Sequence, residues 1–348
     1  MSALSRDLQL DVVRCVAVFL IVLLHAWGAA SQYADPTSWE YRGWTFLAAR
    51  VTGCAMPALF LVSGYLLFKE FSIASWPQKM RRRIRRLGVP YVCWNVVFVL
   101  FYLAVCWFFP RVEARVEAFG LMTGFGCLAK VLHPFVTPID IPVWFMRTIF
   151  VFALAAPVLW GFLRDRYGRW VGFAVAVCYF VSCEFFHRPW DLSGYPAYAL
   201  LVFYIGGLLA VFGRAPCGFF RSVWWLLPGA VGLVLDAMEL LGWCDPLGLV
   251  NRALLMAPVL FYFVSRIPRP ASFIPHPSYL FFLYCGHFLF CSVWVHALAP
   301  RMDVSVPGSL TLLIGLFLIP GLVSLTLSWS LLHRYLRSFL RLFDGQLK

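Results

Sequence analysis

The stretch DVVRCVAVFLIVLLHAW, residues 11–27, is apolar enough for a membrane helix but contains Asp11, Arg14 and His25. A charged group at the centre of a bilayer costs about 2.5–3.5 kcal/mol. Arg14 and His25 are eleven positions apart, so at about 100° per residue their side chains point within about 20° of each other. Asp11 precedes Arg14 by three residues and neighbours it on that face. The stretch predicts a spanning helix whose polar stripe faces the protein interior or a hydrated cavity.

A second interpretation of this helix is a simple anchor. Arg14 would then extend to the cytoplasmic headgroups, and His25 would lie near the outer surface and bond a neighbour. The functional interpretation rests on the chemistry of imidazole, which transfers protons near neutral pH, so a His within a cavity is a reasonable general base.

The composition is that of a protein with many membrane helices. Of the 348 residues, 62% are hydrophobic and 13% are charged, whereas soluble domains are typically about 45–50% apolar and about 25% charged. Residues 1–348 are therefore expected to form a single all-α transmembrane domain, with no room for a sizeable soluble one. Ten apolar runs approach the roughly 20 residues that a crossing needs: 8–28, 44–68, 89–109, 143–163, 169–187, 195–213, 222–241, 247–265, 277–298 and 309–332.

Basic residues are unevenly distributed between the ends of these runs. With the N-terminus in the cytoplasm, the inside segments hold 19 Lys and Arg residues and the outside segments hold six. This asymmetry favours ten spans with both termini in the cytoplasm, and it explains most of the net charge of +13 without a nucleic-acid partner. Residues 333–348 are expected to form a short basic cytoplasmic tail at the membrane surface. The longest outer segment, 110–142, is expected to help cover a substrate cleft.

The sequence gives no sign of a metal site or a permanently bound cofactor. Its eleven Cys residues are scattered singly, with no Cys-x-x-Cys pair and no zinc-type spacing. They are expected to be small buried side chains rather than disulfides or metal ligands. The phosphate-binding glycine motifs and the HExxH motif are also missing from the sequence.

The segment KMRRRIRRLGVPY, residues 79–91, contains five Arg within six positions at the start of the third run. One interpretation is topological, with the charges held at the cytoplasmic face and in contact with anionic lipid. The other is a phosphate site, because Arg binds phosphate oxygens bidentately and keeps its charge. The residues that would bind phosphate are Arg82, Arg83, Arg85 and Arg86.

Five motifs, in order along the chain, resemble those of the acyltransferase-3 family of integral-membrane acyltransferases in its stand-alone, ten-span form. Arg14 and His25 are similar to its R-X10-H signature, and SGYLL (63–67) to its motif in the second span. RRRIRRLGVPY (81–91) resembles its basic entry to the third span. PVWFMRTIFVFALAAP (142–157) and SYLFFLYCGHFLF (278–290) resemble its later segments, the second containing His287.

The resemblance implies an enzyme that transfers an acyl group, usually acetyl, from cytoplasmic acyl-CoA. The acceptor would be a hydroxyl of a carbohydrate or lipid-linked glycan of the bacterial envelope, and the location would be the inner membrane. A thioester is already activated, so no metal or further cofactor is needed. The partners implied are acyl-CoA, the glycan and membrane lipids.

Within such an enzyme the candidate residues take distinct roles. His25 would be the general base, or would carry the acyl group as an acyl-imidazole. Arg14, paired with Asp11, would hold the coenzyme A end or orient the helix. The tetrahedral intermediate needs an oxyanion donor, and the substrate or oxyanion candidates are Ser63, Tyr65, Trp144 and Arg147, with His287 as either a packing residue or a site residue.

Two other classes of function fit parts of the sequence. A transporter or flippase for a sugar or lipid-linked glycan would use intramembrane Asp, Arg and His as a proton or substrate pathway, although the two related halves typical of transporters are not evident. A membrane scaffold would leave the aligned Asp11, Arg14 and His25 without a purpose.

Overall fold

Helices are the only regular elements among the residues that the structure, a computed structural model, describes: 7–108, 141–186, 198–241, 252–267, 274–298, 302, 308–337 and 341–343. The all-α prediction is confirmed for this part of the chain. Nearly all of the segment 110–142, which is expected to cover a cleft, lies outside the described residues.

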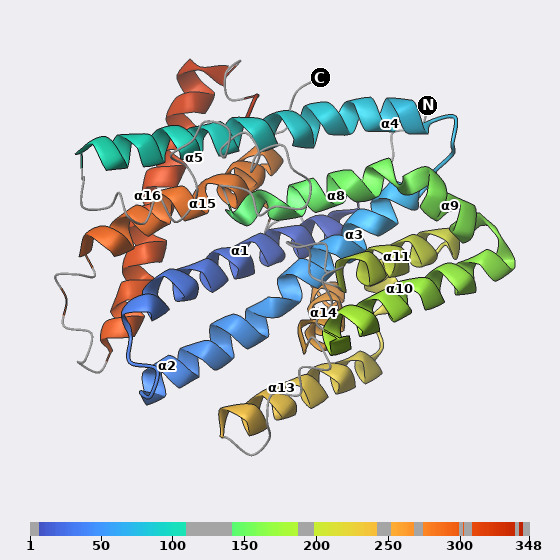
Figure 1. Cartoon of the computed structure of the whole chain (residues 1–348), viewed down its shortest axis with the longest axis horizontal. Coiled ribbons are helices and arrows are strands. Elements are labelled where there is room, and N and C mark those ends of the chain that lie inside the picture. The colour runs from blue at the N-terminus through green and yellow to red at the C-terminus, as the bar shows by residue number, and fades with distance from the viewer. Residues whose placement is uncertain are drawn as a thin grey trace.

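The first part of the chain forms three long helical segments (Figure 1). Asp7 starts the first of them by accepting a hydrogen bond from the Leu10 backbone N–H at 3.2 Å, which is a typical N-cap. The elements are α1 (Leu8–Ala30), η1 (Ser31–Tyr33), α2 (Trp39–Trp44), the π-helical η2 (Thr45–Val51), η3 (Thr52–Cys54), α3 (Ala55–Phe68), α4 (Trp76–Arg83), the π-helical η4 (Ile84–Gly88) and α5 (Val89–Phe108).

The later part of the chain continues as helices with one sharp bend. Helices α8 and α9 meet at an angle of 59° at the start of α9, where Pro157 cannot donate a backbone hydrogen bond. The elements are η6 (Ile141–Val143), α8 (Trp144–Leu154), α9 (Ala156–Arg164), α10 (Arg166–Phe186), α11 (Tyr198–Val211), α12 (Pro216–Phe219), η7 (Val223–Trp225), α13 (Leu226–Leu240), α14 (Arg252–Ser265), α15 (Pro277–Leu298) and α16 (Ser309–Tyr335).

Glycines allow α3 and α11 to approach each other closely. A Cβ added at Gly64 would overlap the backbone carbonyl of Phe203, and one added at Gly206 would overlap that of Leu61. Small residues at such crossings allow membrane helices to pack tightly without a hydrophobic driving force. Gly64 of the SGYLL motif therefore has a packing role in this fold.

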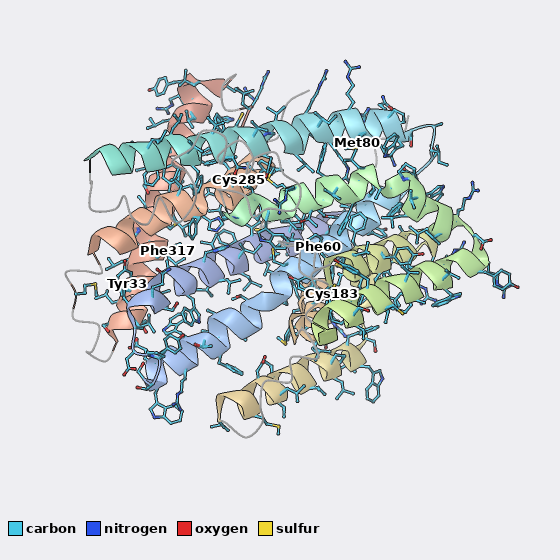
Figure 2. The ribbon with its side chains drawn as sticks, viewed as in Figure 1. Tyr33, Phe60, Met80, Cys183, Cys285 and Phe317 are labelled. Atoms are coloured by element: carbon cyan, nitrogen blue, oxygen red, sulfur yellow. The ribbon has the colours of Figure 1, made fainter. Side chains whose placement is uncertain are left out.

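The buried apolar side chains form three clusters along the bundle (Figure 2). Phe60 lies in the largest cluster, which joins α3, α8, α11 and α14. Cys285 belongs to the second cluster, between α1, α5 and α15, and Phe317 belongs to the third, near the start of α16. Helix α1 contacts both α3 and α15, and the side chains of its polar stripe, Asp11, Arg14 and His25, are partly buried.

Large apolar side chains also lie on the outside of the molecule at helical spacing. Ile319, Val323, Leu327 and Leu331 follow one another every four residues along α16, and each is more than half exposed. Contiguous exposed apolar patches of this length are rare in monomeric soluble proteins. The arrangement is that of a multi-pass membrane protein whose outer face contacts lipid.

Each of the ten apolar runs predicted from the sequence falls on one or more helices. Among the described residues, four helical segments are long and apolar enough to cross a membrane, and a fifth is obtained if the bent pair α8–α9 counts as one span. Four further apolar helices are shorter. The number of ten crossings, and the placement of both termini in the cytoplasm, stay predictions.

Two basic parts of the chain, the α3–α4 and α9–α10 connections with the helix ends next to them, lie on the right of Figure 1, the side toward which the N-terminal end of α1 points. Helix α4 contributes Arg81, Arg82 and Arg83, and the α9–α10 connection contributes Arg164 and Arg166. The sequence predicts that all of these residues are on one side of the membrane, and the arrangement of the helices is consistent with that prediction.

Candidate active site

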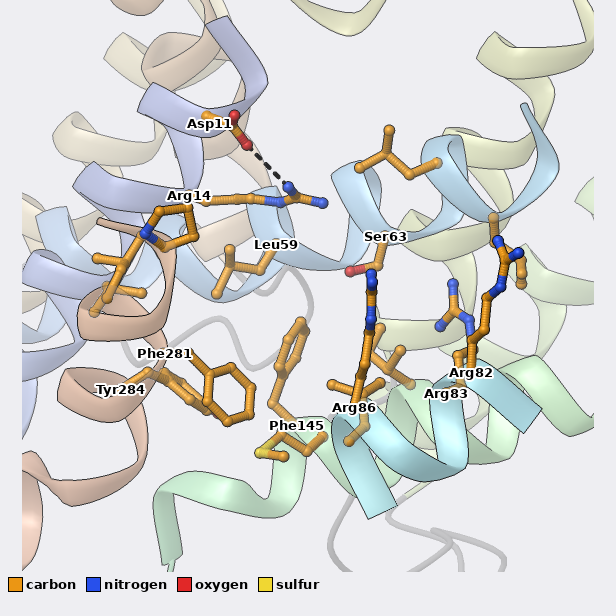
Figure 3. Close-up of a pocket in the computed structure, with 18 of the residues that line it drawn as sticks. Asp11, Arg14, Leu59, Ser63, Arg82, Arg83, Arg86, Phe145, Phe281 and Tyr284 are labelled. Atoms are coloured by element: carbon orange, nitrogen blue, oxygen red, sulfur yellow. Dashed lines mark hydrogen bonds and ion pairs between the residues drawn. The ribbon is translucent and has the colours of Figure 1, made fainter. Parts of the chain in front are cut away.

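A pocket of about 550 Å³ opens between α1, α3, α4, η4, α8 and the first turns of α15 (Figure 3). Sites for small molecules and cofactors typically have volumes of about 300–1,000 Å³. Five cationic side chains and one carboxylate are among the residues that line the pocket. Within the described part of the chain, no group of three or more His, Cys, Asp or Glu side chains is arranged to hold a metal ion. The pocket is therefore suited to an anionic organic ligand.

One wall of the pocket is built by four cations that follow one another along α4 and η4. Lys79, Arg82, Arg83 and Arg86 all line the pocket, and we call these four residues the cationic wall. Their spacing of three, four and seven positions places them on one face of a helix. The cationic wall presents several N–H donors to one volume, which is the arrangement that binds phosphate groups.

Arg14 and Asp11 line the pocket from α1. Arg14 Nη1 donates to Asp11 Oδ1 at 3.1 Å, and the two side chains are 41% and 16% exposed, so the ion pair is partly hydrated. Figure 3 shows Arg14 reaching into the hollow from α1, Arg86 reaching into it from η4, and Ser63 of α3 nearby. The cations therefore come from two separate elements and converge on one space.

The pocket becomes apolar away from the cations. Phe145 and Met146 of α8, together with Phe281 and Tyr284 of α15, line this part. The Tyr284 hydroxyl donates to the backbone carbonyl of Pro142, which fixes the ring against the start of α8. The pocket thus combines a charged mouth with an apolar interior.

Two histidines lie next to each other beyond the apolar end of the pocket. Val18 lines the pocket, and His25 follows it by seven residues, or about 10 Å along α1. The ring centroids of His25 and His287 are 5.2 Å apart and the rings are tilted by 45°. Phe288 packs its ring edge-on against His25 at 5.5 Å. We call His25 and His287 the histidine pair.

His287 is completely buried in α15. Its Nδ1 lies 2.8 Å from the Tyr284 carbonyl oxygen and 3.1 Å from the Leu283 carbonyl oxygen. Its Nε2 is buried and has no hydrogen-bond partner among the described residues. His25 is only partly buried, so the two rings of the pair have different surroundings.

The structure separates the remaining candidates from the sequence into two groups. Ser63 lines the pocket together with the cationic wall. Tyr65 and Arg147 are buried elsewhere in the bundle, and Trp144 is half-buried beside Phe60. Neither these three side chains nor the exposed Arg85 is among the lining residues of the pocket.

Among the polar side chains that line the pocket, sequence reasoning missed Lys79 and Tyr284. Lys79 could have been found from helical spacing, because it precedes Arg82, Arg83 and Arg86 by three, four and seven positions. Arg85 also follows Arg82 by three positions, so spacing alone does not exclude it; the structure does, because Arg85 is exposed and does not line the pocket. Tyr284 comes from a helix more than 200 residues away in sequence, and no local pattern pairs it with α4.

A sequence model of the acyltransferase-3 family, described as an acyltransferase domain, matches residues 7–333. No curated protein and no solved structure matches the chain.

Proposed function

The chain belongs to the acyltransferase-3 family, and from that premise we propose that it moves an acyl group from cytoplasmic acyl-CoA to a hydroxyl of a carbohydrate or lipid-linked glycan in a bacterial envelope. The family makes the chain a membrane acyltransferase in general. The donor, the acceptor and the site residues are the proposal. The observation that supports it most strongly is the cationic wall, which lines a pocket together with Arg14, eleven residues before His25 on α1.

The charges at the pocket mouth support acyl-CoA as the donor. Coenzyme A carries phosphate groups at one end and the reactive thioester at the other. Arg binds phosphate oxygens with two parallel hydrogen bonds, and Lys adds a point charge. Arg82, Arg83, Arg86 and Lys79 would hold the phosphates from one side, with Arg14 facing them from α1. The pocket mouth would open to the cytoplasm, where acyl-CoA is found.

The depth of the pocket supports a separation between phosphate binding and acyl transfer. Arg14 and His25 are about 16 Å apart along α1. The extended pantetheine arm of coenzyme A would cross this distance through the part of the pocket lined by Phe145, Phe281 and Tyr284. The thioester carbon would then lie near the histidine pair, away from the hydrated mouth.

The reaction at His25 would be a general-base acyl transfer. One ring nitrogen of His25 takes the proton of the acceptor hydroxyl as its oxygen attacks the thioester carbon. The C–O bond forms, the tetrahedral intermediate collapses, and the C–S bond breaks. The departing coenzyme A thiolate takes the proton from His25, which restores the neutral ring. In the alternative order, His25 itself attacks and briefly carries the acyl group.

Developing charge on the thioester oxygen needs a hydrogen-bond donor. Ser63 is the one of the four candidates that lines the pocket, but it lies with Arg14 and Arg86 at the cationic end, so it would contact the phosphate end of the donor rather than the thioester oxygen. Tyr65, Trp144 and Arg147 would have to act through a rearrangement, because they lie off the pocket wall.

The experiment that tests this function is acyl-CoA turnover by the purified protein in nanodiscs. We expect release of free coenzyme A thiol from acetyl-CoA, slow with water and faster with a hydroxyl acceptor. His25→Ala should reduce release by at least about 100-fold, because a general base contributes roughly 10²–10⁴. His333→Ala, a matched change on α16 away from the pocket, should stay within about twofold of wild type.

Two outcomes would contradict the proposal. Release that is equal in the wild type and in His25→Ala would remove His25 from the reaction. A wild-type protein that neither binds nor cleaves acetyl-CoA would remove acyl-CoA as the donor and favour transport of a glycan instead.

A further inference from the structure

His287 carries two nitrogens in different surroundings, and this difference fixes the chemistry of its ring. Nδ1 lies within hydrogen-bond distance of two backbone carbonyl oxygens, those of Tyr284 and Leu283. Carbonyl oxygens only accept hydrogen bonds, so Nδ1 must carry the proton. In the neutral ring the lone pair is then on Nε2, which makes Nε2 an acceptor.

The acceptor nitrogen of His287 is left without a partner in the interior of the bundle. Nε2 is buried and makes no hydrogen bond within the described part of the chain, and the whole side chain has no exposed surface. Buried polar atoms are nearly always paired, and an exception calls for an explanation. The ring that lies against His287 and could supply an N–H donor is that of His25, with a centroid distance of 5.2 Å.

A centroid distance of 5.2 Å brings the two rings close enough for a hydrogen bond to form through one water, or directly after a small movement of the His25 side chain. Catalytic hydrogen bonds are often long in a protein without substrate and shorten when the substrate binds. Phe288 packs edge-on against His25 at 5.5 Å and leaves the ring little room to turn away. The arrangement resembles that of a catalytic triad, in which a third group orients the base and stabilises it after it takes a proton. His287 would be that third group, and His25 would be the base.

We propose that His287 is a positioning residue that accepts a hydrogen bond from His25 through its Nε2 and holds the other nitrogen of His25 toward the acceptor hydroxyl. The inference rests on the proposed function and adds a second residue to it. When His25 takes the hydroxyl proton, the proton stays on His25, and the hydrogen bond to His287 stabilises the imidazolium. No further reactant is needed, and the leaving thiolate removes the proton as before.

Tyr284 connects the histidine pair to the pocket that would bind the donor. The Tyr284 ring lines the pocket, and its backbone carbonyl holds Nδ1 of His287 at 2.8 Å. The residue that would border the acyl-CoA arm therefore also sets the tautomer of the residue behind the base.

Two substitutions separate a positioning role from a packing role. In His287→Asn the amide can still donate to the Tyr284 carbonyl, but nothing remains at the place of Nε2. In His287→Gln the longer side chain can bring its amide oxygen near the place of Nε2, where it can again accept from His25. We expect His287→Asn to lower kcat for acetyl transfer at least tenfold with KM for acetyl-CoA unchanged, and His287→Gln to recover most of the loss.

The controls keep the outcome interpretable. His333→Asn on α16 should leave kcat within about twofold of wild type, and all variants should elute as single species in size-exclusion chromatography. If His287→Asn and His287→Gln lower kcat equally, or if they raise KM for acetyl-CoA instead of lowering kcat, then His287 has a packing role and the proposal is overturned. A wild-type kcat in His287→Asn would overturn it as well. Failure of the proposed function gives a different result, because neither the wild type nor any variant would then transfer the acyl group.

Discussion

The cationic wall and the histidine pair differ in exposure and in charge, although we propose that both serve one reaction. The wall lies at the pocket mouth, where Arg82 and Arg86 are exposed and charge is hydrated. The histidine pair lies past the apolar end, where His287 is fully buried and one of its nitrogens has no partner among the described residues. Hydrated charges can bind anions with little cost to the fold, whereas the buried His287 ring is suited to holding the neighbouring His25 ring in one orientation. The difference predicts that substrate binding and chemistry can be impaired separately.

The largest effect on binding is expected when two members of the cationic wall are neutralised together. Each charge-assisted hydrogen bond to a phosphate contributes about 1.5–3 kcal/mol, so Arg83→Gln with Arg86→Gln should raise KM for acetyl-CoA roughly 100-fold or more. The value of kcat should change little, because the histidine pair is untouched. Steady-state CoA release over a range of acetyl-CoA concentrations measures both constants.

Arg81→Gln is the matched control for this change, because Arg81 is on the same helix, is exposed and does not line the pocket. A fall in kcat with unchanged KM in the double variant would show that the cationic wall takes part in the acyl transfer step. It would contradict the prediction that binding and chemistry can be impaired separately.

A smaller and sharper effect separates Arg86 from Arg85. The sequence gives both as phosphate ligands, but only Arg86 lines the pocket. Arg86→Gln should raise KM for acetyl-CoA roughly 10-fold or more, whereas Arg85→Gln should change it less than about threefold, as expected for a surface charge. Equal effects measured under the same assay conditions would mean that net charge, and not the geometry of the wall, attracts the donor.

The smallest effect is expected at Asp11. Asp11→Asn keeps an oxygen that can accept from Arg14 Nη1 but loses the charge of a partly exposed ion pair. Such pairs contribute about 0–1 kcal/mol, so KM for acetyl-CoA should rise no more than about fivefold, because Arg14 is held less firmly. A loss of kcat would instead connect Asp11 to the reaction at His25, and titration of acetyl-CoA at fixed enzyme concentration distinguishes the two.

Much of the fold could be predicted because its signals are local. Apolar runs of about 20 residues identify membrane helices without any knowledge of their neighbours, and all ten predicted runs fall on helices. The polar stripe of α1 was predictable for the same reason, since Asp11, Arg14 and His25 are on one helix. Local patterns predict neither the angle of the bend between α8 and α9 nor the close packing of α3 against α11 at Gly64 and Gly206.

Single side chains of the candidate site could be predicted on several helices, but which of them lie together could be predicted only within one helix. Arg82, Arg83 and Arg86 were accessible to sequence reasoning, and helical spacing would have added Lys79. The contact between His25 and His287 depends on how α1 packs against α15, which begins almost 250 residues after the end of α1. Tertiary contacts of this kind leave no periodic signal in a single sequence.

The central claim is that the pocket binds the donor at its cationic side and that acyl transfer takes place beyond its apolar side, at His25. The most direct test is to measure the affinity for acetyl-CoA and the rate of CoA release on the same three nanodisc preparations: wild type, His25→Ala, and Arg83→Gln with Arg86→Gln. We predict that His25→Ala binds acetyl-CoA like the wild type but releases almost no CoA. The double Arg variant should lose affinity and yet approach the wild-type rate at saturating acetyl-CoA. If His25→Ala loses affinity for acetyl-CoA, or if the double Arg variant stays slow at saturating acetyl-CoA, then donor binding and acyl transfer do not depend on separate groups of residues, and the claim is contradicted.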